Sequence, residues 1–280
     1  NSPVGAYAFT TLTCIPGLLE YKHAKIQVLD VPGIVEGAAV GRGRGKEVLA
    51  CAQSADLVII LLDVFHPDHH NVILNEIRET GLRINQKPPQ IKITKKIRGG
   101  IDIGLTVKLT KINRETITAI LKEFRLDNSS IVIRDDITDD ELIDAIEGNM
   151  RYVPGITVLN KIDMISQEEL ERIKKAVKPD ICVSAELKEN TEELKDLIFQ
   201  RLNFMRIFCK EVGKRADTEV PLIMRNGNTL RDTCLKLHRD FTSNFKFARI
   251  WGKSAKFPGM QVRSLGHVLQ DEDIVEIHLR

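Results

Sequence analysis

Three short polar motifs follow apolar runs and carry residue types suited to nucleotide chemistry. The first is Asp30-Val31-Pro32-Gly33, which comes after the apolar run of residues 24–29. A carboxylate at a strand end can hold Mg²⁺ through water, and a glycine three residues later lets a backbone N–H approach a terminal phosphate closely. Asp30 is therefore a candidate magnesium ligand and Gly33 a candidate phosphate contact. Alone, the pattern fits a simple strand-end turn equally well.

The second motif is Asn160-Lys161-Ile162-Asp163, which follows the apolar residues 155–159. The Asp163 carboxylate could accept both the N1–H and the exocyclic amine of guanine. Asn160 could bond the other edge of the base, and the Lys161 stem could cover its face. Adenine lacks that pair of donors, so mismatched polar groups would exclude it. The alternative is a polar turn before a helix.

The third motif is Ser184-Ala185-Glu186, which follows residues 181–183. A turn of small residues there, built from Ser184 and Ala185, can aim the Ala185 amide at guanine O6. The three motifs occur in the order that a GTPase requires, and this order is more informative than any one of them. They jointly predict a site for guanine nucleotide.

A fourth segment, Phe9-Thr10-Thr11-Leu12, fits the switch region expected upstream of these motifs. A threonine hydroxyl there can ligate Mg²⁺ directly, and its amide can sense the γ-phosphate. Thr11 is the preferred ligand and Thr10 the alternative. With Gly33, Thr11 completes the candidate catalytic pair.

The strands that must position these motifs are near-continuous apolar runs separated by helical segments. This pattern predicts an α/β fold with a mostly parallel sheet covered on both faces, and residues 56–63 read as a strand buried on both sides. Ligands of such sheets bind at the carboxyl ends of the strands. Those ends carry Asp30, Asn160 and Ser184.

Two further units are predicted outside this sheet. The first is an α+β insertion over residues 82–150, because about 90 residues between Asp63 and Gly155 far exceed the roughly 25 to 30 of one crossover. The second, over residues 218–280, reads as a ubiquitin-like β-grasp. The expected elements are strands at 101–110, 130–134, 220–225, 247–251 and 273–279, and helices at 113–126, 138–147 (opened by a capping box and stopped by Gly148) and 229–241.

Longer runs resemble one known family. Residues 4–17, residues 30–38, the loop Gly41-Arg42-Gly43-Arg44-Gly45 and Tyr152-Val153-Pro154 ahead of Asn160 are similar to the developmentally regulated GTP-binding (DRG) proteins of the Obg group. The resemblance spans essentially all 280 residues. It implies a P-loop GTPase domain over residues 1–81 and 151–215, an insertion like the second domain of ribosomal protein S5, and a C-terminal TGS domain.

The resemblance also implies ligands, partners and a compartment. GTP or GDP with Mg²⁺ would be the cofactors, and a monovalent cation is a further candidate. Family members associate with translating ribosomes, and the eukaryotic ones bind dedicated stabilising partner proteins. A GTP-hydrolysing, ribosome- or RNA-associated switch in the cytoplasm is therefore expected.

Two features of the sequence limit this expectation. The phosphate-binding pattern GxxxxGK[ST] does not occur in the 280 residues, and in the family it lies just upstream of the position where this chain begins. We therefore expect an N-terminal portion beyond the 280 residues; the alternative is a non-catalytic RNA- or ribosome-binding scaffold. Ile34 stands where many GTPases carry a water-orienting glutamine, which predicts slow intrinsic hydrolysis. Arg42 and Arg44 could serve as a cis arginine finger or belong to a solvated switch segment.

Composition narrows the partners. Forty-one basic and 39 acidic residues nearly balance, and the longest apolar run, residues 57–62, is far short of the roughly 18 needed to cross a membrane. Five scattered cysteines without a CxxC pair argue against a disulfide scaffold or zinc ribbon and favour a reducing cytosol. We expect neither a membrane partner nor DNA specificity.

Charge and histidine clusters suggest further contacts. Residues 221–263 hold nine basic and two acidic side chains, with Phe245, Phe247, Trp251 and Phe257 interleaved. They could bind RNA phosphates and bases, or form a solvated face over a core that includes Phe247 and Trp251. A second basic run, Lys92, Lys95, Lys96 and Arg98, fits either a ribosome-facing loop or an exposed hairpin. His66, Asp68, His69 and His70 could hold a metal or lie in a polar loop.

Overall fold

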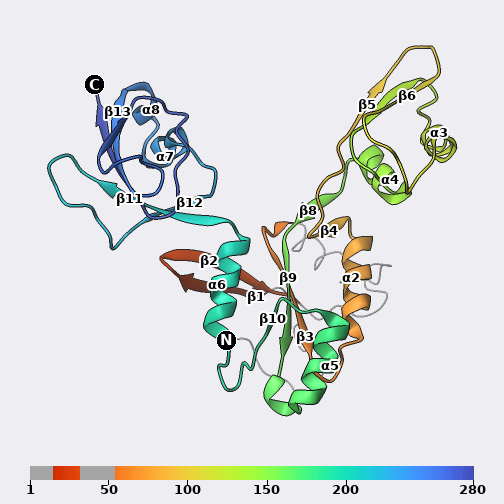
Figure 1. The fold of residues 1–280 in the computed structure, drawn as a ribbon, viewed down its shortest axis with the longest axis horizontal. Coiled ribbons are helices and arrows are strands. Elements are labelled where there is room, and N and C mark those ends of the chain that lie inside the picture. Colours follow the sequence, from red (N-terminus) through yellow and green to blue (C-terminus); the bar gives the residue numbers. More distant parts are fainter. Residues whose placement is uncertain (1–14, 32–53) are drawn as a thin grey trace. The chain divides into compact units, whose positions relative to one another are not determined.

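A computed structural model describes residues 15–31 and 54–280 (Figure 1). These residues fall into two compact units. One unit comprises the described residues 15–31 and 156–280, and the other comprises residues 54–155. The expected switch residue Thr11, with Thr10, and the residues Gly33, Ile34, Arg42 and Arg44 lie outside the described residues. None of the helices in the described ranges is long and apolar enough to cross a membrane.

The first unit begins with an antiparallel hairpin. Strands β1 (Ile15–Tyr21) and β2 (Ala24–Asp30) pair along their full lengths, and Lys22 and His23 at the turn adopt left-handed φ values of 47° and 67°. The strand at 24–30 is confirmed. Its expected place in the parallel sheet is wrong for the described residues, because β2 pairs with β1 instead. Pro16 concealed β1 in the sequence, since proline is depleted in strands.

The parallel pairing that positions two motifs involves β9 (Gly155–Asn160) and β10 (Ile181–Cys182). Val158 lies opposite Ile181, and Leu159 lies opposite Cys182. Between them, helix α5 (Gln167–Val177) starts at a capping box formed by Ser166 and Glu169. The expected strands at 155–159 and 181–183 are confirmed, β10 being one residue shorter.

The second unit contains strand β3 (Val58–Asp63) and helix α2 (His69–Glu79). The strand is confirmed, but its expected burial on both faces is wrong: Ile60 and Leu62 are buried, whereas Ile59 and Leu61 are 37% and 60% exposed. A continuous apolar run does not reveal which of its alternating faces is covered.

The chain leaves for the insertion along β4 (Leu82–Ile84) and returns along β8 (Arg151–Val153), and these strands pair in parallel. Arg83 makes a bidentate ion pair with Asp144, both bonds 2.6 Å long, and both side chains are less than 10% exposed. Arg83 also donates to the Arg78 carbonyl at 2.8 Å. These hydrogen bonds fix the Arg83 guanidinium at the junction between β4 and the insertion.

Gly155 closes the same junction. Its N–H donates to the side-chain oxygen of Asn85 at 2.8 Å, and its carbonyl accepts from the Asn85 amide at 3.2 Å. A Cβ at Gly155 would collide with the Ile84 side chain, so the approach of these two segments requires glycine.

The insertion is a small α+β layer pair (Figure 1). Its sheet has the order β5-β7-β6, and its core includes Ile117, Leu121, Ile131 and Leu142. The elements are β5 (Ile91–Lys95), β6 (Ile101–Leu105), α3 (Arg114–Glu123), β7 (Ser129–Ile133) and α4 (Asp139–Glu147).

The predicted helix caps in the insertion are confirmed, but α3 ends at Glu123 rather than at the expected Leu126. Asn113 caps α3 by accepting from the Thr116 N–H, Thr138 and Glu141 form the capping box of α4, and Gly148 ends α4 with φ 65°. The exposed-hairpin alternative for the basic run is wrong, because β7 lies between β5 and β6. The strand expected at 101–110 ends at Leu105.

The C-terminal module is a five-stranded sheet with the order β12-β11-β15-β13-β14, in which β11 and β15 are parallel and the other pairs are antiparallel. One face packs on α7 around Ile207, Leu230, Ile250 and Val275. The elements, after helix α6 (Thr191–Arg201), are β11 (Phe204–Lys210), β12 (Leu222–Arg225), α7 (Leu230–Leu237), α8 (Asp240–Ser243), β13 (Phe245–Trp251), β14 (Met260–Val262) and β15 (Asp273–Leu279).

Two details of this module differ from expectation. The helix ends at Leu237 rather than Phe241, because His238 is extended (φ −161°, ψ 145°). Strand β11 lies between β12 and β15, so the sheet extends upstream of the expected domain start at residue 218. Strand β15 has the predicted limits.

Removing Asp144 should test the junction. Asp144→Ala would leave the buried Arg83 guanidinium without its counter-charge, and we expect a loss of about 3–5 kcal/mol in unfolding free energy, measured by urea denaturation. The exposed pair Arg78–Asp140 offers the control, since Asp140→Ala should cost no more than about 1 kcal/mol. Equal effects of the two substitutions would contradict the assigned role.

Candidate nucleotide-binding site

The guanine-recognition motifs meet at the carboxyl edge of β9 and β10. Asn160 ends β9, and the loop after β10 begins at Val183. The side-chain oxygen of Asn160 accepts a hydrogen bond from the Ala185 backbone N–H at 3.1 Å. The second motif therefore holds the third in place through a direct bond, as the shared sheet edge predicts.

The turn after Asn160 sets the direction of the Asp163 carboxylate. Lys161 adopts a left-handed conformation (φ 66°, ψ 34°), and the 3-10 helix η1 (Ile162–Met164) follows it. The left-handed state costs a non-glycine residue roughly 1–2 kcal/mol. Backbone bonds offset this cost: Ile162 donates to the Val183 carbonyl at 3.4 Å, and Met164 donates to the Lys161 carbonyl at 3.0 Å. The Asp163 side chain is exposed within this turn, open to a ligand.

Ser184 and Ala185 have different surroundings. Ser184 is fully buried; its hydroxyl accepts from the Leu187 N–H at 3.1 Å, and its backbone exchanges two hydrogen bonds with Glu189. Ala185 is exposed. In this geometry Ser184 fixes the loop from within, while Ala185 presents the surface that a base could meet.

Asn190 is a site-supporting residue that the sequence motifs did not identify. Its amide donates to the Cys182 carbonyl at 2.9 Å, which anchors the far end of the Ser184 loop. Asn190 adopts a left-handed φ of 55°. Asparagine tolerates this region better than most residues, so the residue type is the sequence signal for this turn. Burial raises the pKa of the neighbouring Cys182 thiol, which disfavours its thiolate form.

Of the residues expected near the phosphates, the structure describes only Asp30. Asp30 is exposed at the end of β2, in the hairpin sheet rather than in the sheet of β9 and β10. Thr11 and Gly33 lie outside the described residues. The structure thus brings Asn160 together with Ala185 and sets Lys161 and Asp163 in the adjoining turn.

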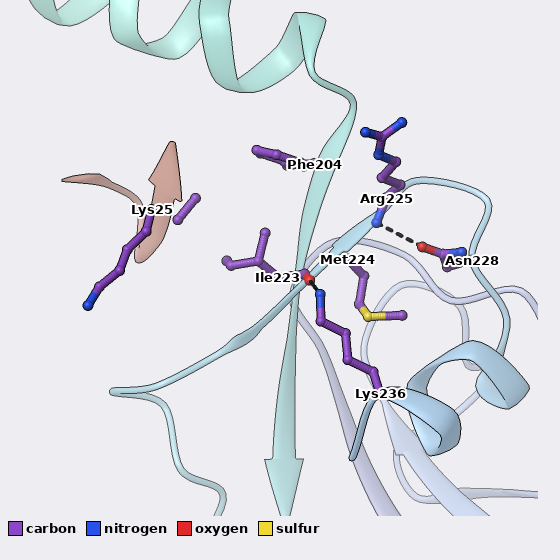
Figure 2. A pocket seen from close by; sticks show the side chains of 8 residues that line it. Lys25, Phe204, Ile223, Met224, Arg225, Asn228 and Lys236 are labelled. Carbon is purple, nitrogen blue, oxygen red and sulfur yellow. Dashed lines mark hydrogen bonds between the residues drawn. The ribbon is translucent and has the colours of Figure 1, made fainter. Parts of the chain in front are cut away.

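A separate pocket of about 350 Å³ lies between β2 and the C-terminal sheet, away from these motifs (Figure 2). Apolar side chains and three cationic ones line it. In Figure 2 the Lys236 ammonium donates to the Ile223 carbonyl, and the Asn228 side chain accepts from the Arg225 N–H. The lining residues are Ala24, Lys25, Phe204, Ile223, Met224, Arg225, Asn228 and Lys236.

Comparison with protein families assigns the parts of the chain. Residues 1–96 match the family described as 50S ribosome-binding GTPase, residues 98–204 match the C-terminal region of that domain, and residues 205–279 match the TGS domain. The class is therefore a GTP-binding protein of the GTPase type that carries a C-terminal TGS domain.

Individual relatives define the family. The chain is 49% identical to the uncharacterized GTP-binding protein MJ1326 of Methanocaldococcus jannaschii, covering all of this chain and 72% of that protein. It is 43% identical to developmentally-regulated GTP-binding protein 1 of Xenopus laevis, over 99% of this chain and 75% of that one. Developmentally-regulated GTP-binding protein 2 of Bos taurus is 41% identical over 99% and 76%. The chain belongs to the DRG family of GTP-binding proteins.

A solved GTP-binding protein from Pyrococcus horikoshii OT3 aligns with 97% of this chain and 90% of its own, at 13% identity and a TM-score of 0.46. A likeness at this level adds nothing to the family assignment, which stands on the sequence relatives.

Asn160→Ala should loosen the Ser184 loop. Loss of one hydrogen bond worth about 1 kcal/mol would raise the exchange rate of the Ala185 amide roughly fivefold. Hydrogen exchange monitored by NMR would measure this. The exposed Asn149→Ala is the matched control and should leave that amide unchanged; unchanged protection in Asn160→Ala as well would contradict the proposed link.

Proposed function

We propose that the protein is a GTP-hydrolysing switch whose base site is built by β9, β10 and the turns after them. Asp163 accepts the two guanine donors, Asn160 bonds the other edge of the base, and the Lys161 stem covers its face. The Ala185 N–H, which donates to Asn160 in this structure, would turn to guanine O6 when the base binds. The observation that carries the proposal is the Asn160–Ala185 hydrogen bond, which preorganises two separate motifs for one ligand.

The phosphate side completes the proposed mechanism. Thr11 and Asp30 would hold Mg²⁺, which would neutralise phosphate charge there, and the Gly33 amide would contact the γ-phosphate. In a GTP-driven switch the residues Thr11 and Gly33 would keep these contacts with GTP bound and lose them after hydrolysis. Ile34 cannot orient the attacking water, so intrinsic turnover is slow, and a monovalent cation is a candidate aid to it. Ser184 acts as a positioning residue of the Ala185 loop.

The phosphate-binding loop pattern is absent from the 280 residues, which span 72% to 76% of the related proteins compared above. Enzymatic activity is therefore proposed for a protein that supplies that loop. The alternative for these residues by themselves is a non-catalytic RNA- or ribosome-binding scaffold. Guanine-nucleotide affinity separates the two functions.

Asp163→Asn tests the base assignment. The amide would offer a donor where guanine needs an acceptor, so GDP affinity should fall on the order of 100-fold while xanthine nucleotides gain. Competition of GDP and XDP for a fluorescent nucleotide, in the protein with its phosphate loop, would measure both. Asp127→Asn, an exposed aspartate of the insertion, should leave the preference for guanine intact. Retained guanine preference in Asp163→Asn would refute the assignment.

We further propose that the switch acts on ribosomes in the cytoplasm through RNA contacts of the TGS module and the basic run of the insertion, with a stabilising partner protein of the family type. All nine basic side chains between Pro221 and Arg263 are exposed. The match of residues 1–96 to a family described as 50S ribosome-binding GTPase supports this partner.

The sheet face opposite α7 offers a specific RNA surface. On β13 the residues Ala248 and Ile250 enter the core, whereas Phe247, Arg249 and Trp251 alternate with them and lie outside it. The expected core placement of Phe247 and Trp251 is therefore wrong. A bulge between Phe245 and Phe247 shifts the alternation, so that Phe245 alone of these aromatics is in the core.

Neighbouring strands extend this face in register. Phe247 stacks on His278 with ring centroids 4.2 Å apart, and the Lys210 ammonium lies 4.9 Å from the centre of the Trp251 ring. Glu276 on β15 lies between Lys210 on β11 and Arg249 on β13, and it is the register partner of both. Aromatic rings beside cations on an open sheet are the arrangement that stacks unpaired bases and holds their phosphates.

Phe247→Ala tests this surface. Loss of one stacked base should cost about 1–3 kcal/mol and weaken binding of a single-stranded RNA roughly 5- to 150-fold, as measured by fluorescence anisotropy. Phe257→Ala is the control, because Phe257 is an exposed aromatic in the loop between β13 and β14. Arg249→Gln should also flatten the salt dependence of binding. Equal affinities of both phenylalanine variants and the parent protein would exclude the sheet face.

A further inference from the structure

The loop after β3 gathers three metal-binding side chains. One ring nitrogen each of His66 and His69 and one carboxylate oxygen of Asp68 all lie within 4.8 Å of one another. The two imidazole rings stack, with centroids 5.0 Å apart and planes 12° from parallel. All three side chains are exposed, so an ion could reach them from solvent.

The backbone fixes this grouping. The Asp63 carboxylate accepts from the Phe65 N–H at 2.8 Å, and its carbonyl accepts from the His66 N–H at 3.1 Å. The His66 carbonyl in turn accepts from the His69 N–H at 3.2 Å, which folds the second histidine back over the first. Consecutive hydrogen-bonded turns therefore hold the backbone of His66 and His69 so that their side chains lie close together.

We propose that His66, Asp68 and His69 bind one divalent transition-metal ion of the zinc class. Two imidazoles and a carboxylate are a donor set that suits zinc and its neighbours, at metal–ligand distances of about 2.0–2.2 Å. Donor atoms around a tetrahedral ion at these distances are about 3.3–3.6 Å apart, so a separation of up to 4.8 Å closes with a movement of roughly 1.2–1.5 Å. Exposed side chains can make that movement by small torsional changes.

Two charges near the cluster act on a bound cation in opposite directions. The N-terminus of α2 carries a partial positive charge that opposes an ion there. Asp68 is the N-cap of α2, yet its side chain makes no capping hydrogen bond. Its carboxylate remains available to offset the helix charge and to ligate the metal. Three protein ligands leave a coordination position for water or for a donor from a partner.

His70 adjoins the cluster in sequence but lies outside it in space. One further residue along a helix rotates the side chain by about 100°, away from its neighbour. His70 is half-buried, and burial lowers its pKa. The structure thus narrows the four residues identified in the sequence to three, and His70 becomes a matched control.

Isothermal titration with ZnCl₂ on the whole chain tests the proposal, and it does not depend on nucleotide binding. His66→Ala and His69→Ala should each weaken one Zn²⁺ equivalent by at least about tenfold, since even outer-shell losses cost 10- to 100-fold. His70→Ala and the exposed His238→Ala should leave this equivalent intact. The cysteines can bind zinc on their own account, so only the equivalent that these variants change is assigned to the cluster.

A second readout uses Co²⁺ in place of Zn²⁺. The visible absorption of bound cobalt should change in Asp68→Asn and disappear in the double variant His66→Ala/His69→Ala. Circular dichroism would establish that the double variant is folded. Zinc affinity and cobalt absorption equal to those of the parent protein in a folded double variant would overturn the proposal, as would an equal loss in His70→Ala.

Discussion

The parallel pairing of β9 with β10 is the constraint on which the candidate nucleotide site depends. Only two residues on each strand are in register, yet they bring the ends of both strands to one edge. The Asn160–Ala185 hydrogen bond then joins the loops that leave this edge. Joining the two loops in advance lowers the entropy cost of the proposed base binding, in which the Ala185 N–H would exchange its bond to Asn160 for one to guanine O6.

The modules attached to the GTPase domain hold together by different means. The insertion and the C-terminal module each have an apolar core of their own. At the start of the insertion, the buried Arg83–Asp144 pair adds a directional contact that apolar packing does not supply. A buried pair of this kind adds little net stability, but its loss on one side leaves an uncompensated charge. The pair therefore determines the orientation of α4 against β4 more than it adds to the stability of their contact.

The C-terminal sheet divides its two faces between folding and proposed recognition. One face supplies Ile207, Ile250 and Val275 to the core with α7. The alternate residues carry aromatic rings and charges, among them Trp251 and Lys210. Because side chains alternate along a strand, the apolar face that folds the module leaves the second face free to carry a different chemistry.

Much of this protein could be read from its sequence because the deciding interactions are local. The capping box of α4 and the Gly148 stop depend on neighbouring residues, and both agree with prediction. The three nucleotide motifs likewise indicated a guanine-nucleotide site by type, order and spacing, and the longer runs identified the family. Strands β1, β4, β5, β8, β11 and β14 escaped prediction, because their stability comes from partners elsewhere in the chain.

Tertiary structure alone decided which faces these elements present. The bulge after Phe245 moves Phe247 and Trp251 out of the core, since a shift of one residue reverses every side chain that follows. Turn geometry likewise brings His66 and His69 together and leaves His70 outside their cluster. Sequence determined the chemistry available to the protein, and the pairing of distant segments determined where each group points, because register and turn geometry are settled only when those segments meet.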